Sequence, residues 1–240
     1  MFEEGALIIP SYREKENLAK LLPKLFKSYP QLTVIVVNDE SGDGTKEFLE
    51  HYQKKFRNLH LINVRGKRGR GAAVVVGMKL ALRQKNIQYI AEMDADFSHD
   101  PREFIRLWEK RDSQKVIIGS RYIRGSKIVN WPLSRRLMSR VINLLLSSTL
   151  RLGVKDNTNG YRLYPRQAVA YLTKQNFVTA GFINLSEMGL ILKRAGFSFT
   201  EVPIKFIDRT LGKSKTNFYE LFTSLQGLLC IWRKYFFAGK

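Results

Sequence analysis

Apolar runs and amphipathic segments alternate through the first half of this 240-residue chain. We predict buried strands at 6–9, 32–37, 59–63, 88–93 and 116–118, with helices between them at 14–26, 45–56, 72–84 and 101–111. The run 32–37 is apolar on both faces, as a strand of a parallel sheet requires. This alternation predicts the α/β class, with a mostly parallel central sheet flanked by helices.

The predicted strand 88–93 ends in two carboxylates one residue apart, Asp94 and Asp96. Residues i and i+2 of an extended segment project the same way, so both can face the crevice where α/β sheets bind ligands. Two carboxylates this close repel each other unless a cation or a proton intervenes. Mg²⁺ or Mn²⁺ would relieve the repulsion and typically brings substrate phosphates with it. An Asp-rich turn before a helix starting at Pro101 explains the same residues.

A basic glycine loop occupies residues 65–71. It lacks the hydroxyl residue of a P-loop, and Val74 stands where a dinucleotide-binding loop has its third glycine. Lys67, Arg68 and Arg70 at a helix start can attract phosphate, whereas a solvated basic turn would have the same sequence.

The chain carries 41 Lys+Arg against 21 Asp+Glu, a net charge of +20 with a pI near 10.1. This excess implies a polyanionic partner such as nucleic acid, anionic lipid or a phosphorylated substrate. The single Cys230 excludes an internal disulfide and suits a reducing compartment. We expect no secretion leader and no membrane span, because the longest apolar stretches, near 141–150 and 221–232, are short.

Two segments are predicted to be amphipathic helices. Residues 113–155 contain no Asp or Glu, and the helix at about 132–152 carries Arg136 and Arg140 beside an apolar face. A basic helix of this type suits a membrane surface, although packing on the protein's own core would give the same pattern. The tail 218–237 repeats the pattern, with Trp232 near its end, and equally fits a partner-binding or core helix.

The motifs assemble into a family resemblance that covers nearly the whole chain in order. They are Pro10-Ser-Tyr12-Arg-Glu14-Lys-Glu-Asn17, Val37-Asn-Asp39-x-Ser41-x-Asp43-Gly44-Thr45, Glu92-Met-Asp94-Ala-Asp96-x-Ser-His99-x-Pro101, Ile118-Gly-Ser-Arg121-Tyr122, Asn130-Trp131-Pro132-x-x-Arg135-Arg136, Asn159-Gly160-Tyr161-Arg162-Leu163, Glu201-Val-Pro203-Ile and Asp208-Arg209-x-x-Gly212-x-Ser214-Lys215. This set resembles the dolichol-phosphate mannosyltransferases, which are inverting family 2 glycosyltransferases with a GT-A fold.

The resemblance implies roles for the matching residues. Nucleotide base and ribose would be held by Pro10, Tyr12, Glu14, Val37 and Asp39. The diphosphate and metal would meet Asp94, Ala95 and Asp96, with Asp96 the main metal ligand and Asp94 and Ser98 as further candidates. Phosphates of donor or acceptor would be bound by Lys67, Arg121, Arg135, Ser139, Arg209 and Lys215. We expect Asp94, Asp96 and Arg121 to be catalytic.

Several positions depart from the family pattern. Asn38 replaces the usual first Asp of a pair, and Arg68 and Arg70 stand where leucines are common. Ser98 occupies a position where some relatives have Gln, and the family's Ser-Gly-Phe-Arg reads Asn159-Gly-Tyr-Arg162 here.

The expected activity is transfer of mannose from GDP-mannose to dolichyl or polyprenyl phosphate with inversion, using Mg²⁺ or Mn²⁺. No Ser-His-Asp or Cys-His set is evident, and the dianionic lipid phosphate needs no dedicated base. His99 is expected to orient the metal loop. Alternatives are a relative using UDP-glucose or another sugar nucleotide and, more remotely, a basic nucleic-acid-binding module.

The expected organisation is a catalytic domain over 1–215 and a C-terminal amphipathic helix over 216–240. The resemblance implies peripheral attachment to the cytoplasmic face of the endoplasmic reticulum or of a prokaryotic plasma membrane. A small membrane-anchoring subunit is a possible partner, and no nucleic acid is expected.

Overall fold

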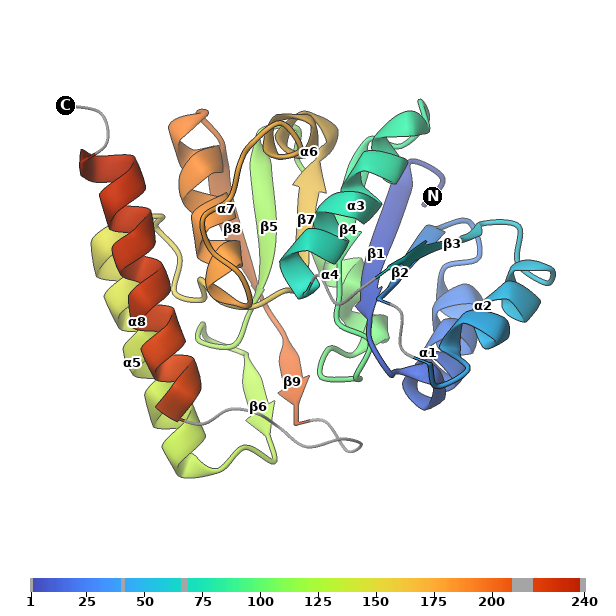
Figure 1. Ribbon diagram of the computed structural model, residues 1–240, viewed down its shortest axis with the longest axis horizontal. Coiled ribbons are helices and arrows are strands. Elements are labelled where there is room, and N and C mark those ends of the chain that lie inside the picture. The colour runs from blue at the N-terminus through green and yellow to red at the C-terminus, as the bar shows by residue number, and fades with distance from the viewer. Residues whose placement is uncertain (1, 40–41, 66–68, 209–217, 238–240) are drawn as a thin grey trace.

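The computed structural model describes residues 2–39, 42–65, 69–208 and 218–237, with the side chains of 218–222 left out (Figure 1). The strands are β1 (Gly5–Ser11), β2 (Thr33–Asp39), β3 (Leu59–Val64), β4 (Tyr89–Glu92), β5 (Lys115–Ser120), β6 (Lys127–Val129), β7 (Arg162–Pro165), β8 (Ser198–Pro203) and β9 (Lys205–Ile207). The α-helices are α1 (Lys15–Ser28), α2 (Thr45–Gln53), α3 (Arg70–Arg83), α4 (Phe104–Glu109), α5 (Leu133–Leu150), α6 (Arg166–Leu172), α7 (Ile183–Arg194) and α8 (Phe218–Trp232). A 3₁₀ turn, η1 (Pro101–Glu103), precedes α4, and a π-helical turn, η2 (Arg233–Phe237), follows α8.

The central sheet has seven strands in the order β3-β2-β1-β4-β7-β5-β8, and β6 and β9 form a separate parallel pair. All central neighbours are parallel except β7, which runs antiparallel to both β4 and β5. The predicted mostly parallel sheet is therefore confirmed. The antiparallel β7 was not predicted, because its four residues carry no distinctive periodicity.

Helices cover both faces of the sheet, as expected. The side chains of Leu7 and Ile9 in β1 join the core under α1, α2 and α4. Those of Ala6 and Ile8 point to the opposite face, under α3, α6 and α7. This alternation follows from the two-residue period of a strand, and burial on both faces explains why β1 and β2 are continuous apolar runs.

Strand β1 does not stop before Pro10, as the sequence suggested, but continues to Ser11. Its pairing with β4 ends at Ile8, opposite Glu92, whereas its pairing with β2 runs on to Ser11. Beyond Ile8 the strand therefore has one neighbour instead of two. A proline is tolerated where a ladder hydrogen bond is not needed, so Pro10 marks the end of the β4 pairing and not of the strand.

The long helices α5 and α8 lie beside each other at one end of the molecule, outside α7 (Figure 1). On α5 the side chains of Leu133, Leu137 and Leu144 are exposed at 81%, 63% and 71%, and the buried positions are Asn143, Leu146 and Leu150. The helix therefore packs on the core through Leu146 and Leu150, and the stripe that carries Leu137 and Leu144 stays exposed. Within the described part of the chain, no helix combines the length and apolarity needed to cross a membrane.

Candidate active site

The carboxyl ends of three adjacent parallel strands meet at one edge of the sheet. Ser11 at the end of β1 lies opposite Asn38 in β2, and β4 on the other side of β1 leads into Asp94. Asp39 is buried there, and its Oδ2 accepts a hydrogen bond from the backbone N–H of Gly69, 3.2 Å away. Gly69, directly before α3, thus contacts the strand ends, where α/β sheets bind their ligands.

A cavity of about 300 Å³ opens beside these strand ends. Six of the predicted site residues line it: Asp94, Asp96, Ser98, Arg121, Arg135 and Ser139. The remaining walls come from the segment after β6, from α5, from the loop before β7, from the loop before α7 and from α8. The cavity is polar at the strand ends and has apolar side chains, including Met138, Ile142 and Phe182, at the helical side.

Asp96 offers the more open of the two carboxylates. Its Oδ1 accepts the backbone N–H of Ser98 at 3.0 Å, and no described hydrogen bond engages Oδ2. Phe97 between them adopts a left-handed backbone with φ +60°, which lets the chain turn tightly enough for that bond. The turn fixes Asp96 at the cavity wall with one oxygen available for a ligand. Ser98 itself is buried.

Asp94 is held by a cation instead. Arg70, the first residue of α3, donates from Nε to Asp94 Oδ1 at 2.7 Å and places Nη1 2.9 Å from Oε2 of the buried Glu92. The pKa of the Asp94 carboxyl lies below its ordinary value: burial alone would raise it, and the charge of Arg70 outweighs that effect. Asp94 is therefore ionised and oriented before any ligand arrives.

His99 links the acidic loop that carries Asp94 and Asp96 to Asn159, in the loop before β7. Asn159 donates through Nδ2 to the carbonyl of Gly119, so its Oδ1 faces the ring and accepts from His99 Nε2 at 2.7 Å. The tautomer with hydrogen on Nε2 leaves Nδ1 facing the backbone N–H of Asp94, 3.4 Å away. Burial lowers the pKa of His99, which keeps the ring neutral. These contacts support the expectation that His99 orients the acidic loop.

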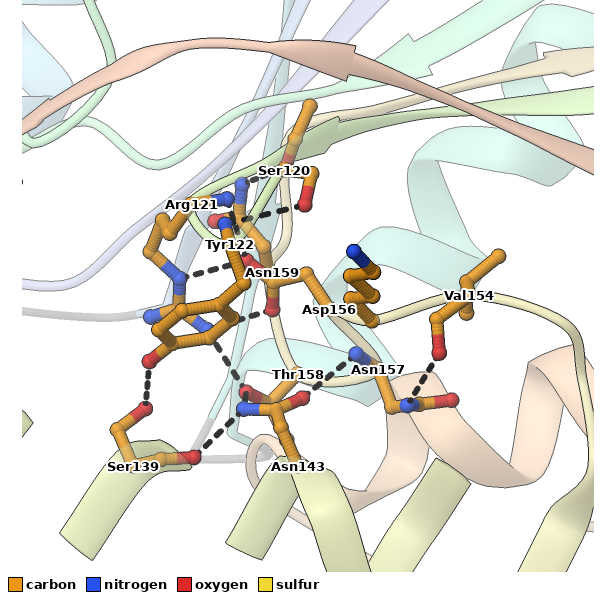
Figure 2. Close-up of polar contacts among 12 residues, drawn as sticks. Ser120, Arg121, Tyr122, Ser139, Asn143, Val154, Asp156, Asn157, Thr158 and Asn159 are labelled. Atoms are coloured by element: carbon orange, nitrogen blue, oxygen red, sulfur yellow. Dashed lines mark hydrogen bonds and ion pairs between the residues drawn. The ribbon is translucent and has the colours of Figure 1, made fainter. Parts of the chain in front are cut away.

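Arg121 is the best-anchored cation of the cavity (Figure 2). Its guanidinium makes a two-pronged ion pair with Asp156, with Nε and Nη2 each 2.7 Å from a carboxylate oxygen, and Nη2 also reaches Thr158 at 2.8 Å. The side chains of Arg121 and Asp156 are 7% and 0% exposed. Burial would lower the pKa of Arg121, and the charge of Asp156 raises it overall. Arg121 is thus a fixed, permanent positive charge.

Arg135 on α5 is held more loosely. Its Nη1 lies 2.7 Å from Asp208, and its guanidinium stacks 4.2 Å from the ring centre of Trp131. Its buried Nε has no hydrogen-bond partner among the residues that the structure describes. On the same helix, Ser139 accepts a hydrogen bond from Tyr122 at 2.6 Å (Figure 2). An unsatisfied buried donor beside a partly exposed ion pair leaves Arg135 with capacity to bind an additional acceptor.

The predicted nucleotide-side residues lie on the other side of the acidic loop. Tyr12 is 37% exposed and stacks under Arg13 at 5.5 Å. Glu14 accepts from Asn17 at 2.5 Å. Pro10 is half-buried, whereas Val37, Asp39 and Ala95 are buried. Lys67, Arg209 and Lys215 lie outside the described residues.

The carboxylates at the cavity fit a divalent cation that takes some of its ligands from the protein and the others from a substrate. Asp96 and Asp94 supply carboxylate oxygens at the cavity, and the described residues contain no cluster of three His, Cys, Asp or Glu able to hold a metal. Mg²⁺ and Mn²⁺ are commonly bound through one or two carboxylates plus substrate phosphates, so this arrangement suits a metal that arrives with a nucleotide diphosphate.

Two functional partners were missed by sequence reasoning. Asp156 is the first acidic residue after segment 113–155, which has basic residues and no Asp or Glu. This position in the sequence is the signal that could have indicated a pairing with a basic residue of the segment. Arg70 was noted only as a phosphate candidate, although its side chain is engaged by Asp94 and Glu92. Both pairings join positions far apart in the chain, which no local pattern reports.

Solved structures with this topology define the class. Glucosyl-3-phosphoglycerate synthase from Mycobacterium tuberculosis, in complex with Mn²⁺, UDP and glucosyl-3-phosphoglycerate, superposes with a TM-score of 0.66 at 14% identity, covering 96% of this chain and 79% of that one. The mannosyltransferase PcManGT from Pyrobaculum calidifontis, in complex with GDP-Man and Mn²⁺, gives 0.63 at 18% identity, covering 99% and 65%. The fold is that of the GT-A glycosyltransferases.

Sequence comparison identifies the family. The profile described as "Glycosyl transferase family 2" matches residues 6–172, and the chain belongs to this family. It is 35% identical over 210 residues to undecaprenyl-phosphate mannosyltransferase of Micrococcus luteus, covering 88% of this chain and 86% of that protein. It is also 35% identical over 213 residues to polyprenol monophosphomannose synthase of Mycolicibacterium smegmatis, covering 88% and 80%.

Proposed function

We propose that this chain transfers mannose from GDP-mannose to a polyprenyl phosphate, such as dolichyl or undecaprenyl phosphate, with inversion at the sugar carbon. The observation that carries the proposal is one cavity lined by Asp94 and Asp96 after β4, by Arg121 after β5, and by Arg135 and Ser139 on α5. The names of the two 35% identical relatives, an undecaprenyl-phosphate mannosyltransferase and a polyprenol monophosphomannose synthase, support this donor and acceptor class.

The main obstacle to this reaction is charge, because an anionic lipid phosphate must approach an anionic sugar nucleotide. A phosphate monoester has its second pKa at about 6, so near neutral pH it is already the nucleophile and needs no separate base. Arg121, fixed by Asp156, would stabilise negative charge without having to reorganise. Arg135 would exchange its partly exposed pairing with Asp208 for the acceptor phosphate.

A divalent cation would offset the charge of the departing nucleoside diphosphate. Asp96 would be its main protein ligand, and Asp94 would contact the sugar nucleotide beside it. Mn²⁺ is the ion named with both structural neighbours, and Mg²⁺ remains an equal candidate for this chain.

The acceptor would reach the cavity from the side of α5 and α8. Exposed apolar residues on α5, on α8 and on the following turn η2 are together called the outward apolar face: Leu133, Leu137, Val141, Leu144, Leu145, Leu225, Leu229, Trp232, Phe236 and Phe237. An exposed apolar patch of this kind indicates a protein or membrane contact. We propose that it rests on the membrane that holds the lipid acceptor, with Arg140 and Arg233 facing phosphate headgroups, alone or beside a small anchoring subunit.

The direct test supplies radiolabelled GDP-mannose, polyprenyl phosphate in detergent and Mn²⁺ or Mg²⁺, and measures label in the lipid fraction. The proposal predicts labelled lipid with wild-type protein and none with the chelator EDTA. Asp96→Ala should lose transfer by about a thousandfold, since a metal contributes several kcal/mol to such a step. Full activity in Asp96→Ala contradicts the assignment of that residue.

The nucleotide of the donor is the least constrained part, because the M. tuberculosis neighbour is bound to UDP. Melting assays with Mn²⁺ and either GDP-mannose or UDP-glucose separate the two donors. The proposal predicts a larger rise in melting temperature with GDP-mannose. A larger rise with UDP-glucose would replace the donor and leave the acceptor chemistry unchanged.

A further inference from the structure

Arg70 contacts two residues that line the cavity, Asp94 and Gly160. Its guanidinium contacts Asp94 Oδ1 at 2.7 Å, Glu92 Oε2 at 2.9 Å and the carbonyl oxygen of Gly160 at 3.2 Å, and its side chain is 14% exposed. The three partners come from β4, from the loop after β4 and from the loop before β7. One side chain therefore ties three segments together behind the acidic loop.

Helix α3 itself does not stabilise the positive charge of Arg70. Arg70 is the first residue of α3, and the first turn of α3 contains no acidic residue. The N-terminus of a helix carries partial positive charge, so an arginine there is unfavourable by itself. The position is stabilised by Asp94 and Glu92, which lie outside the helix.

The guanidinium is closely packed against Gly160 as well as paired with the two carboxylates. A Cβ at Gly160 would clash with Nη2 and Cζ, so a larger residue there would displace the guanidinium from its observed position. Glu92 is completely buried, and its other oxygen accepts from the hydroxyl of Tyr164 at 2.5 Å. Without Arg70 the site would hold Glu92 as a buried carboxylate with no cation, next to Asp94 and Asp96.

We propose that Arg70 is a positioning residue that gives the two carboxylates of the acidic loop different tasks. By engaging Oδ1 of Asp94 it withdraws that carboxylate from metal binding and aims its remaining oxygen at the sugar nucleotide. Asp96, which forms no ion pair with any residue that the structure describes, is then the carboxylate that holds the metal. The inference rests on the proposed function and adds to it the residue that separates the two roles.

The decisive variant is Arg70→Met, which keeps the length of the side chain and removes its charge. Freed Asp94 would join Asp96 as a ligand, so Mn²⁺ binding without nucleotide, measured by EPR titration of free Mn²⁺, should tighten by about tenfold, the equivalent of one charge-assisted hydrogen bond. The KM for GDP-mannose should rise by about tenfold, because Asp94 would no longer be oriented toward the sugar nucleotide and one charge-assisted hydrogen bond would be lost. If Arg70 had a purely structural role, the variant would bind both Mn²⁺ and GDP-mannose more weakly, or neither affinity would change.

Three further variants keep the test interpretable. Arg83→Met removes the same charge from the exposed last residue of α3 and should leave both quantities at wild-type values. Arg70→Lys keeps a cation near Asp94 and should keep Mn²⁺ affinity within about threefold of wild type. If Arg70→Met is too unstable to purify, the double variant with Glu92→Gln removes the uncompensated buried charge and should show the same tightening.

The outcomes separate the inference from the proposed function. If wild-type protein binds no Mn²⁺ even with GDP-mannose present, the proposed function fails. If the wild type binds Mn²⁺ with GDP-mannose but Arg70→Met, or its double variant, binds Mn²⁺ alone with unchanged or weaker affinity, the role of Arg70 is overturned and the function stands. Tighter Mn²⁺ binding together with a raised KM supports both.

Discussion

The two sides of the cavity are stabilised in opposite ways. On the strand side the carboxyl ends of β1, β2 and β4 are packed between helices, and Asp94 is paired with Arg70 inside the protein. On the helical side α5 and α8 turn leucines outward, and Arg135 makes one partly exposed ion pair. The strand side buries its apolar surface and its ion pair, whereas the helical side leaves apolar side chains exposed and its ion pair partly open to solvent.

This difference indicates which ligand each side is built for. A preorganised strand side suits a soluble sugar nucleotide that must be held in one orientation. An outward apolar face and an exchangeable cation suit a lipid phosphate that stays partly in its membrane. Arg121 and Arg135 show the contrast at the level of single residues, and the following changes test it.

The largest effect is expected at the buried pair of Arg121 and Asp156. Arg121→Met leaves the Asp156 carboxylate buried without its cation, which should lower the free energy of unfolding by about 3–5 kcal/mol in urea denaturation. Adding Asp156→Asn should recover much of that loss. A single variant as stable as the wild type would show that the pair is not a structural anchor.

A matched pair of leucine variants on α5 tests the outward apolar face. Leu146 is 2% and Leu144 is 71% exposed, so the two occupy opposite environments on one helix. Leu146→Ala should cost about 2–5 kcal/mol of unfolding free energy, because it opens a cavity in the core. Leu144→Ala should stay within about 0.5 kcal/mol of wild type.

The same leucine should matter for membrane binding. Flotation with vesicles containing anionic lipid should recover less of Leu144→Ser than of wild type, because the variant presents less apolar surface to the bilayer. Equal recovery of both proteins, or no flotation of either, would contradict membrane contact through α5.

Arg135→Ala should have a smaller effect that appears in the acceptor kinetics. The ion pair with Asp208 is partly exposed, so its loss should cost at most about 1 kcal/mol of stability. The KM for polyprenyl phosphate should rise by about tenfold, since one charged hydrogen bond is lost, while the KM for GDP-mannose stays near wild type. A selective rise in the KM for GDP-mannose would place Arg135 on the donor side.

Local pattern predicted the elements of the first half, and helix α5 after them, well. The observed α3 (Arg70–Arg83) and α5 (Leu133–Leu150) lie within about two residues of the predicted 72–84 and 132–152. Periodicity reports that a helix is amphipathic but not what covers its apolar side, so the exposure of Leu137 and Leu144 had to come from the structure. The short β6, β7 and β9 depend on pairing with distant strands and carry too few residues for a pattern.

The candidate site was predictable where residues lie close in sequence and not where they meet from afar. Asp94, Asp96 and Ser98 form one local loop at a strand end, and the structure places all three at the cavity. The pairing of Arg70 with Asp94 and that of Asp156 with Arg121 were not predicted. These contacts join residues that are 24 and 35 positions apart in the chain. Sequence showed which groups are present, and the fold determined which of them are already paired.

The central claim is that the sugar nucleotide binds at the strand ends through a metal on Asp96. The most direct measurement is the melting temperature with GDP-mannose, in the presence and absence of Mn²⁺, for wild type, Asp96→Asn and the control Asp112→Asn, whose carboxylate is partly exposed and paired with Lys115. The account predicts that GDP-mannose with Mn²⁺ raises the melting temperature of wild type and Asp112→Asn, and that Asp96→Asn loses this rise. The same metal-dependent rise in Asp96→Asn would contradict it.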